Sequence, residues 1–204
     1  MAKQQSNAYG PPLEDRVRLP VRILFVGIHP GVRSAAIGHH FAGYSNRFWT
    51  LLFESGLIPE RLKAEDDERL PTWGYGVTNL IPRCTPGIDT LRPDDYVAGL
   101  RRLRRKIRAW KPEIVVLVGV TLYRAVFRPP ASRPVTLGLQ DEHLEHVPVF
   151  VLPNPSGRNA NYSYREMLDA FCELEIYLRG AKGGSGSRGS SGSQGSSGSK
   201  GSRG

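Results

Sequence analysis

The stretch VRILFVGIHPG, residues 21–31, decides how this chain folds. Its first six residues are aliphatic or aromatic apart from Arg22, as in a strand that is buried inside a sheet. The segment from Gly27 to Gly31 that follows can continue neither a strand nor a helix. The sequence therefore predicts a buried strand that ends in a tight turn, with His29 in that turn.

Strand-like and helical segments alternate along the rest of the chain. Apolar runs at 114–118 and 147–152 predict two further buried strands. Apolar residues at helical spacing predict helices over 46–55, 93–110, 121–127 and 164–178. Such alternation is typical of an α/β fold, so we expect one domain with a mostly parallel central β-sheet that helices cover on both faces.

This domain is expected to span residues 21–180. Residues 1–20 are polar and proline-rich, which favours a flexible lead-in, and residues 181–204 are a Gly/Ser-rich flexible tail or linker. Two distant cysteines match neither a disulfide framework nor a zinc spacing, and no apolar run approaches the ~20 residues of a membrane span. We expect a soluble cytoplasmic protein, nucleoid-associated if bacterial, whose formal charge of +9 favours a polyanionic partner.

Two of the strands run into turns that are rich in glycine and proline. These turns are GIHPG at 27–31 and LPNPSG at 152–157. Ligands of open parallel sheets bind at the carboxyl ends of the strands. We therefore expect both turns to face a common crevice.

Four segments then resemble a known family in residues and order: GIHPG (27–31), GHHFAGYSNRFW (38–49), GVTNLIPRCTPG (76–87) and LPNPSGR (152–158). They resemble the uracil-DNA glycosylase superfamily, in particular its mismatch-specific uracil and thymine branch, over residues 21–179. The resemblance implies a monofunctional DNA N-glycosylase. Such an enzyme flips uracil, or thymine and other modified pyrimidines, out of mismatches with guanine and hydrolyses the N-glycosidic bond. It also implies duplex DNA with a mispaired or damaged pyrimidine as partner, a monomer, and neither metal nor cofactor.

The resemblance also assigns roles in the base pocket. Phe41 is expected to stack on the flipped base, although an ordinary core phenylalanine is the alternative. Asn79 is expected to contact the base and Thr85 to lie near the reaction centre, where both residues are otherwise common in turns. The backbone amides of Ile28 and Gly31 are expected to donate to the base oxygens.

The loop from Asn154 to Arg158 resembles the segment that enters the minor groove. Arg158 falls at the position of the wedge that fills the hole left by the flipped nucleotide, although a solvated surface arginine is the alternative. Ser156 and Gly157 are expected to contact phosphate or the widowed base through hydroxyl and backbone groups.

His29 departs from the family pattern, which has an asparagine at this position to hold the attacking water. A neutral imidazole can accept a hydrogen bond from water or act as a base, whereas a protonated one would oppose the positive charge on the sugar. Two hypotheses stay open: His29 replaces the amide in an active glycosylase, or the protein binds lesions with weak or no turnover. A metal site of His29, His39 and His40 is disfavoured, because the branch uses no metal.

The predicted helix at 93–110 carries six basic residues on one face. They are Arg101, Arg102, Arg104, Arg105, Lys106 and Arg108. They could form a DNA-phosphate surface or the solvated side of an amphipathic helix, and we favour the solvated side.

Overall fold

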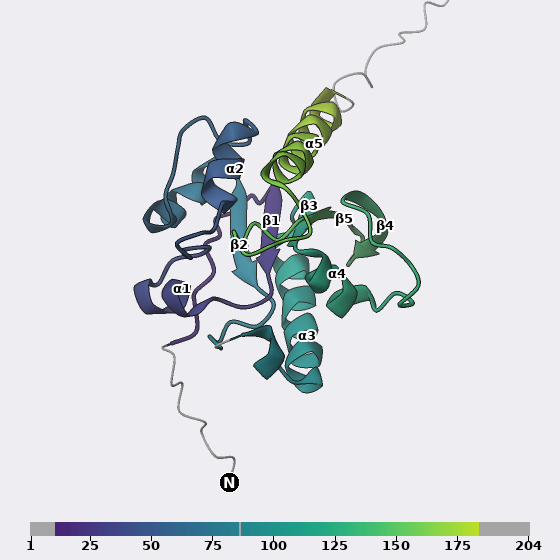
Figure 1. The fold of residues 1–204 in the computed structure, drawn as a ribbon. Helices are drawn as coiled ribbons and strands as arrows, with labels where there is room; N and C mark the ends of the chain where they lie inside the picture. Colours follow the sequence, from purple (N-terminus) through teal and green to yellow (C-terminus); the bar gives the residue numbers. More distant parts are fainter. Residues whose placement is uncertain (1–10, 86, 184–204) are drawn as a thin grey trace, which may run out of the picture.

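The computed structural model describes residues 11–85 and 87–183. In these residues one sheet has the spatial strand order β2-β1-β3-β5-β4 (Figure 1). The strands are β1 (Ile23–Gly27), β2 (Tyr75–Asn79), β3 (Ile114–Val118), β4 (Gly138–Leu144) and β5 (Val147–Leu152). All pairs are parallel except β4 with β5, which is antiparallel. The expected single α/β domain with a mostly parallel sheet is confirmed.

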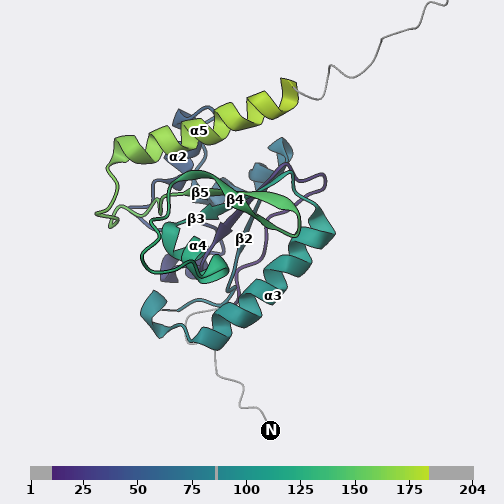
Figure 2. The same cartoon turned by 90° about the vertical axis from the view of Figure 1, so that its right-hand side faces the viewer.

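Helices cover both faces of the sheet, as expected. α2 (Phe48–Glu54) and α5 (Tyr164–Gly183) pack on one face, and α3 (Pro93–Trp110) and α4 (Val120–Phe127) pack on the other. Figure 2 shows α5 and α3 on opposite sides of the strands. The helix α1 (Val32–Ile37) and the 3₁₀ helices η1 (Ala64–Trp73) and η2 (Ile88–Thr90) lie in the connections. None of the described helices is long and apolar enough to cross a membrane.

The opening apolar run is buried on both sides of β1. Ile23 and Phe25 pack into the core beneath α2 and α5, whereas Leu24 and Val26 pack beneath α3 and α4. All four side chains are fully buried. A strand with a helix layer on each face has no polar side, which explains why this run shows no alternation of apolar and polar residues.

The packed domain begins before the expected boundary at residue 21. Leu13 is buried, and Arg16 exchanges backbone hydrogen bonds of 3.0 and 2.9 Å with Val77 of β2. The expectation of a flexible lead-in therefore fails for this segment, while residues 1–10 lie outside the described residues. At the other end α5 continues beyond residue 180 to Gly183, and the predicted tail at 184–204 also lies outside the described residues.

Candidate active site

A cavity of about 800 Å³ lies at the carboxyl edge of the parallel strands. Each parallel strand contributes to its lining at or just after its last residue: Gly27 from β1, Asn79 from β2, Val118 from β3 and Asn154 after β5. The two glycine- and proline-rich turns thus share one crevice, as their position in the sequence predicted. The predicted site residues that line it are Ile28, His29, Gly31, Phe41, Asn79, Asn154, Ser156 and Arg158.

His29 is half-buried in the turn after β1, and its ring orientation follows from its neighbours. Its Nδ1 lies 2.9 Å from the carbonyl oxygen of Pro30, which can only accept, so Nδ1 carries the proton. The hydroxyl of Thr85 lies 3.4 Å from the same nitrogen and donates to the carbonyl of Gly87 at 3.0 Å. In this tautomer Nε2 keeps its lone pair, and no described residue hydrogen-bonds to it.

The surroundings of His29 also favour the neutral form of its ring. Burial lowers the pKa of His29 below its ordinary value, and the positive charge of Arg83 lowers the pKa further, while the bond to Pro30 acts in the opposite direction. Thr85 is buried and stands behind the ring, outside the cavity lining. The predicted proximity of Thr85 to the reaction centre is therefore indirect, through His29.

Phe41 and Asn79 lie close together around Gly27. A side chain at Gly27 would place its Cβ 2.7 Å from Oδ1 of Asn79 and 3.8 Å from the ring of Phe41, so glycine is required for this approach. The Phe41 ring stacks on Phe48 of α2, with ring centroids 3.9 Å apart. Phe41 is thus anchored to the core on one face and borders the cavity.

The buried His40 orients the amide of Asn79. Nε2 of His40 donates to the carbonyl of Glu14 at 2.8 Å, so its Nδ1 is an acceptor. The Nδ2 of Asn79 lies 3.4 Å from this Nδ1. Burial lowers the pKa of His40, the largest effect on it, while the Glu14 carbonyl and the charge of Asp67 raise the pKa. Because a neutral His40 accepts from Nδ2 of Asn79, the amide oxygen Oδ1 of Asn79 lies over Gly27.

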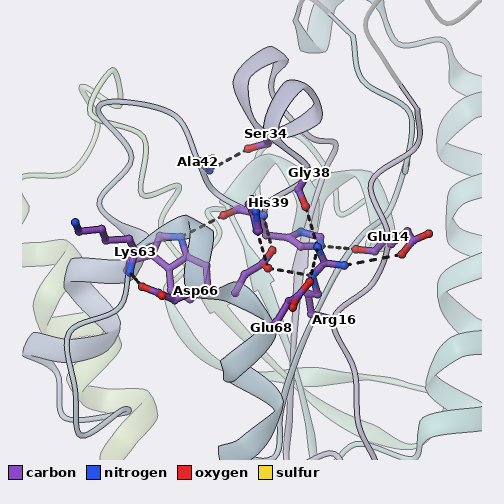
Figure 3. A network of polar contacts seen from close by, with 12 residues as sticks. Glu14, Arg16, Ser34, Gly38, His39, Ala42, Lys63, Asp66 and Glu68 are labelled. Atoms are coloured by element: carbon purple, nitrogen blue, oxygen red, sulfur yellow. Dashed lines mark hydrogen bonds and ion pairs between the residues drawn. The ribbon is translucent and has the colours of Figure 1, made fainter.

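A polar network that includes Arg16 and His39 (Figure 3) holds the backbone that carries Phe41. Asp67 of η1 is fully buried and accepts from Nε of Arg16 at 3.0 Å, from Nδ1 of His39 at 3.0 Å and from the amide of His40 at 2.8 Å. Phe41 has φ +53°, a conformation that costs a bulky residue of order 1 kcal/mol or more. The network around Asp67 holds this strained turn in place.

The histidines of the 38–49 segment are therefore structural anchors. His39 binds Asp67 and His40 binds the Glu14 carbonyl, so neither side chain converges on His29. Across residues 11–85 and 87–183, no group of three or more His, Cys, Asp or Glu side chains could hold a metal ion.

The loop predicted as the minor-groove wedge forms the rim of the cavity. Its backbone amides are held internally: the amide of Ser156 donates to Oδ1 of Asn154 at 3.1 Å, and that of Arg158 to the Ser156 hydroxyl at 3.3 Å. The side chain of Arg158 is exposed at the rim. This loop therefore presents an arginine on a braced turn.

Gly157 serves the packing of this rim. Its amide donates to the carbonyl of Ser45 at 2.7 Å, and a Cβ on Gly157 would lie 2.7 Å from the Ser45 backbone oxygen. This bond uses the amide that was expected to face DNA, and Gly157 does not line the main cavity. By contrast, the amides of Ile28 and Gly31 have no hydrogen-bond partner among the described residues, so they remain available as donors.

The basic face of α3 is partly neutralised by the protein itself. Arg104 and Arg108 pair with Glu145 at 3.7 and 2.6 Å, and Lys106 pairs with Asp15 at 2.7 Å. This pairing favours the interpretation of this face as a solvated helix surface.

Several residues at the site were not identified from the sequence. Arg83 acts on the charge state of His29, Asp67 anchors the turn of Phe41, and Tyr44 is an exposed aromatic at the rim. The sequence around Asp67 or Arg83 does not indicate a role at the site, because the contacts that define these roles join residues 27 or more positions apart.

The comparison with protein families agrees with this arrangement. A family model described as the uracil DNA glycosylase superfamily matches residues 15–175. The match begins within the segment that packs against β2 and continues into α5, so it covers all strands and every residue that lines the cavity except Leu13. Members of this superfamily are DNA glycosylases, hydrolases that act on DNA in its repair. The chain belongs to the uracil DNA glycosylase superfamily.

Proposed function

We propose that the protein excises uracil from mismatches with guanine in duplex DNA, with a water that His29 positions. The observation that carries this proposal is the tautomer of His29 at the cavity: Nδ1–H is committed to the Pro30 carbonyl, which leaves the lone pair on Nε2, and His29 lines the cavity. An asparagine amide oxygen, which the family normally uses here, offers water the same kind of acceptor.

The reaction needs only groups that this cavity offers. Water adds to C1′ of the sugar, the N-glycosidic bond breaks, and its electron pair leaves with the base as an anion. Nε2 of His29 accepts a proton from the water, and the amides of Ile28 and Gly31 stabilise charge on the base oxygens. A neutral imidazole does not repel the developing sugar cation, which is why a lowered pKa supports this role.

The amide of Asn79 supports a preference for uracil over cytosine. Its Nδ2 is directed to His40, which leaves Oδ1 as an acceptor over Gly27 at the cavity. Uracil and thymine carry an N–H at ring position 3, whereas cytosine has a lone pair there. An acceptor that faces this position accepts a hydrogen bond from the N–H of uracil or thymine. It disfavours cytosine, because the lone pair of the acceptor would face the lone pair of the cytosine nitrogen.

Arg158 supports extraction of the base from a duplex. It projects from a braced loop at the mouth of the cavity, where an inserted side chain would occupy the space of the flipped nucleotide. The second candidate function, lesion binding without turnover, rests on the replacement of asparagine by His29.

Incubation with a labelled duplex that contains one U·G pair, followed by alkali, separates the two functions. We expect strand breakage at the uracil in buffer with EDTA, and none in the same duplex with C·G. Activity that EDTA abolishes and zinc or magnesium restores would contradict the proposed chemistry. A mobility shift without breakage would favour lesion binding.

A further inference from the structure

A second hollow of about 330 Å³ lies beside the cavity, on the other side of the rim. Residues 44–46 line both spaces, so one short segment separates them. Arg47 and Thr50 form one part of the hollow, and Gly157 and Tyr164 complete it. The base cavity and this hollow are therefore immediate neighbours.

Arg47 brings an uncommitted positive charge to the hollow. Its guanidinium lies over the ring of Tyr164, 5.4 Å from the centroid, and no carboxylate of the described residues forms an ion pair with it. The neighbouring Glu54 is bound by the Tyr164 hydroxyl and by Arg61 at 3.6 Å. A half-buried arginine without an acidic partner is suited to an anion supplied from outside.

Tyr44 stands on the segment between the two spaces and is 91% exposed. The guanidinium of Arg33 lies over its ring, 4.1 Å from the centroid, in a cation–π contact. A tyrosine side chain this exposed does not contribute to packing in the core. An exposed aromatic ring beside a base pocket is suited to stacking on another base.

The hollow is fixed relative to the wedge loop. The amide of Arg47 donates to the Pro155 carbonyl at 2.9 Å, that of Gly157 to the Ser45 carbonyl at 2.7 Å, and Asn46 pairs with Ser156 as a β-bridge. A strand held in the hollow would therefore keep a constant position relative to both the cavity and Arg158.

We propose that this hollow is a second nucleotide subsite, which binds the nucleotide adjoining the flipped one on the same DNA strand. Arg47 pairs with its phosphate, and Tyr44 stacks on its base. The inference rests on the proposed function, since it requires a strand whose flipped base occupies the cavity. Its role is to hold the strand next to the flipped nucleotide, which opposes return of the base to the stack.

Phosphate scanning tests this subsite. The probe is a duplex with 2′-fluoro-2′-deoxyuridine opposite guanine, which resists hydrolysis, and with one uncharged methylphosphonate at each phosphate near the uridine in turn. The parent protein, Arg47→Gln and Arg47→Lys are compared by dissociation constant. Arg179→Gln is the matched control, because it removes one charge from an exposed position on the last turns of α5.

We expect one adjoining phosphate at which the methylphosphonate weakens parental binding about 10- to 100-fold. Arg47→Gln should weaken binding similarly, lower the salt slope by about 0.9, and be indifferent to the methylphosphonate at that position. Arg47→Lys should keep the salt slope, and Arg179→Gln should leave the phosphate profile unchanged. Thermal unfolding checks that each variant folds.

Tyr44→Ala tests the stacking part without any change of charge. It should weaken binding about 5- to 100-fold with an unchanged salt slope, whereas Tyr44→Phe should bind like the parent. Two results would overturn the subsite, provided that the parent binds and cleaves uracil DNA. The first is that the effects of Arg47→Gln and the methylphosphonate add at every position, and the second is that Tyr44→Ala binds with the parental affinity. A parent that neither binds nor cleaves such DNA would refute the proposed function as well.

Discussion

Substitution of His29 tests the proposed chemistry most directly. His29→Ala removes the only proposed acceptor for the water and leaves the Thr85 hydroxyl and the Pro30 carbonyl without their common donor. His29→Asn introduces the amide that the resemblance to the mismatch-specific branch predicts at this position. His29→Gln offers an amide at nearly the reach of Nε2 without a titrating group, so it separates positioning of the water from acceptance of its proton.

The expected size of the effect follows from what each variant keeps. General acid–base catalysis contributes about 10²–10⁴ in rate, so His29→Ala should lose roughly that factor if Nε2 accepts the proton and less if it only orients water. His29→Asn should match or exceed the parental rate, because an amide acceptor returns to the same turn. His29→Gln should fall between the two. Binding to the non-hydrolysable duplex should change little in all three, since Phe41 and Asn79 remain.

The pH dependence gives an independent check. The ordinary pKa of histidine is about 6.5, and burial lowers that of His29, so the neutral form persists below this pH. Parental activity should therefore be constant through neutral pH and fall only on the acidic side of 6.5, where Nε2 gains a proton. The acid limb due to His29 should be absent in His29→Asn and His29→Gln.

Single-turnover excision from a U·G duplex, with protein in excess and rates measured from pH 5 to 8.5, supplies both readouts. Because the product need not be released, the observed rate reports chemistry and base flipping alone. If His29→Ala cleaves at the parental rate with the parental pH profile, His29 is only a turn residue. The water would then have to be held by another group, with Asn79 next to be substituted.

Two further predictions concern the rim and the buried histidine. Arg158→Ala should weaken binding to U·G duplex about 5- to 30-fold. Because Arg158 is exposed, the free energy of unfolding should change by less than ~0.5 kcal/mol. Unchanged affinity, measured by fluorescence anisotropy, would remove Arg158 from the interface. Burial lowers the pKa of His40 in the folded state, so below pH 6.5 the unfolded chain binds more protons than the folded one. The free energy of unfolding therefore falls as the pH drops, by up to about 1.4 kcal/mol per pH unit for this histidine. Urea unfolding from pH 7 to 5 should show a shallower slope for His40→Gln, and an identical slope would contradict a neutral buried His40.

The buried strands with continuous apolar runs, β1, β3 and β5, were the most predictable strands, because a strand between two helix layers needs apolar side chains on both faces. The predicted runs at 114–118 and 147–152 coincide with β3 and β5, and the predicted helix at 93–110 coincides with α3. β2 was missed, since its sequence YGVTN was considered only as part of a motif. Its glycine and polar residues carry little strand signal, and its position comes from pairing with β1.

The edge strand β4 shows a different failure. Its sequence GLQDEHL is largely polar, as suits an edge strand, and offers no continuous apolar run. The turn to β5 has positive φ at both Glu145 and His146, 52° and 66°, where Asn-Gly or Asp-Gly is the usual signal. Pairing with β5 outweighs both local preferences, and such pairing is not readable from the segment itself.

The candidate site was predictable only as far as motifs reach. His29, Phe41 and Asn79 were expected together and do share one cavity. Asp67 and Arg83 were not foreseen, because they act through packing between segments that are distant along the chain. Local pattern thus identified the groups that border the cavity, whereas tertiary contacts determine their tautomers, charges and directions.

These tertiary contacts explain how a histidine can stand at the position where the resemblance to the mismatch-specific branch predicts an amide. In water an imidazole would be partly protonated near neutral pH, and its free ring could present either nitrogen. Here burial and Arg83 favour the neutral form, and the Pro30 carbonyl commits the proton to Nδ1. What remains on the ring is one lone-pair acceptor, Nε2, and an asparagine oxygen would supply the same property. The substitution is therefore chemically compatible with hydrolysis, because the fold lowers the pKa of the ring and commits its proton to Nδ1.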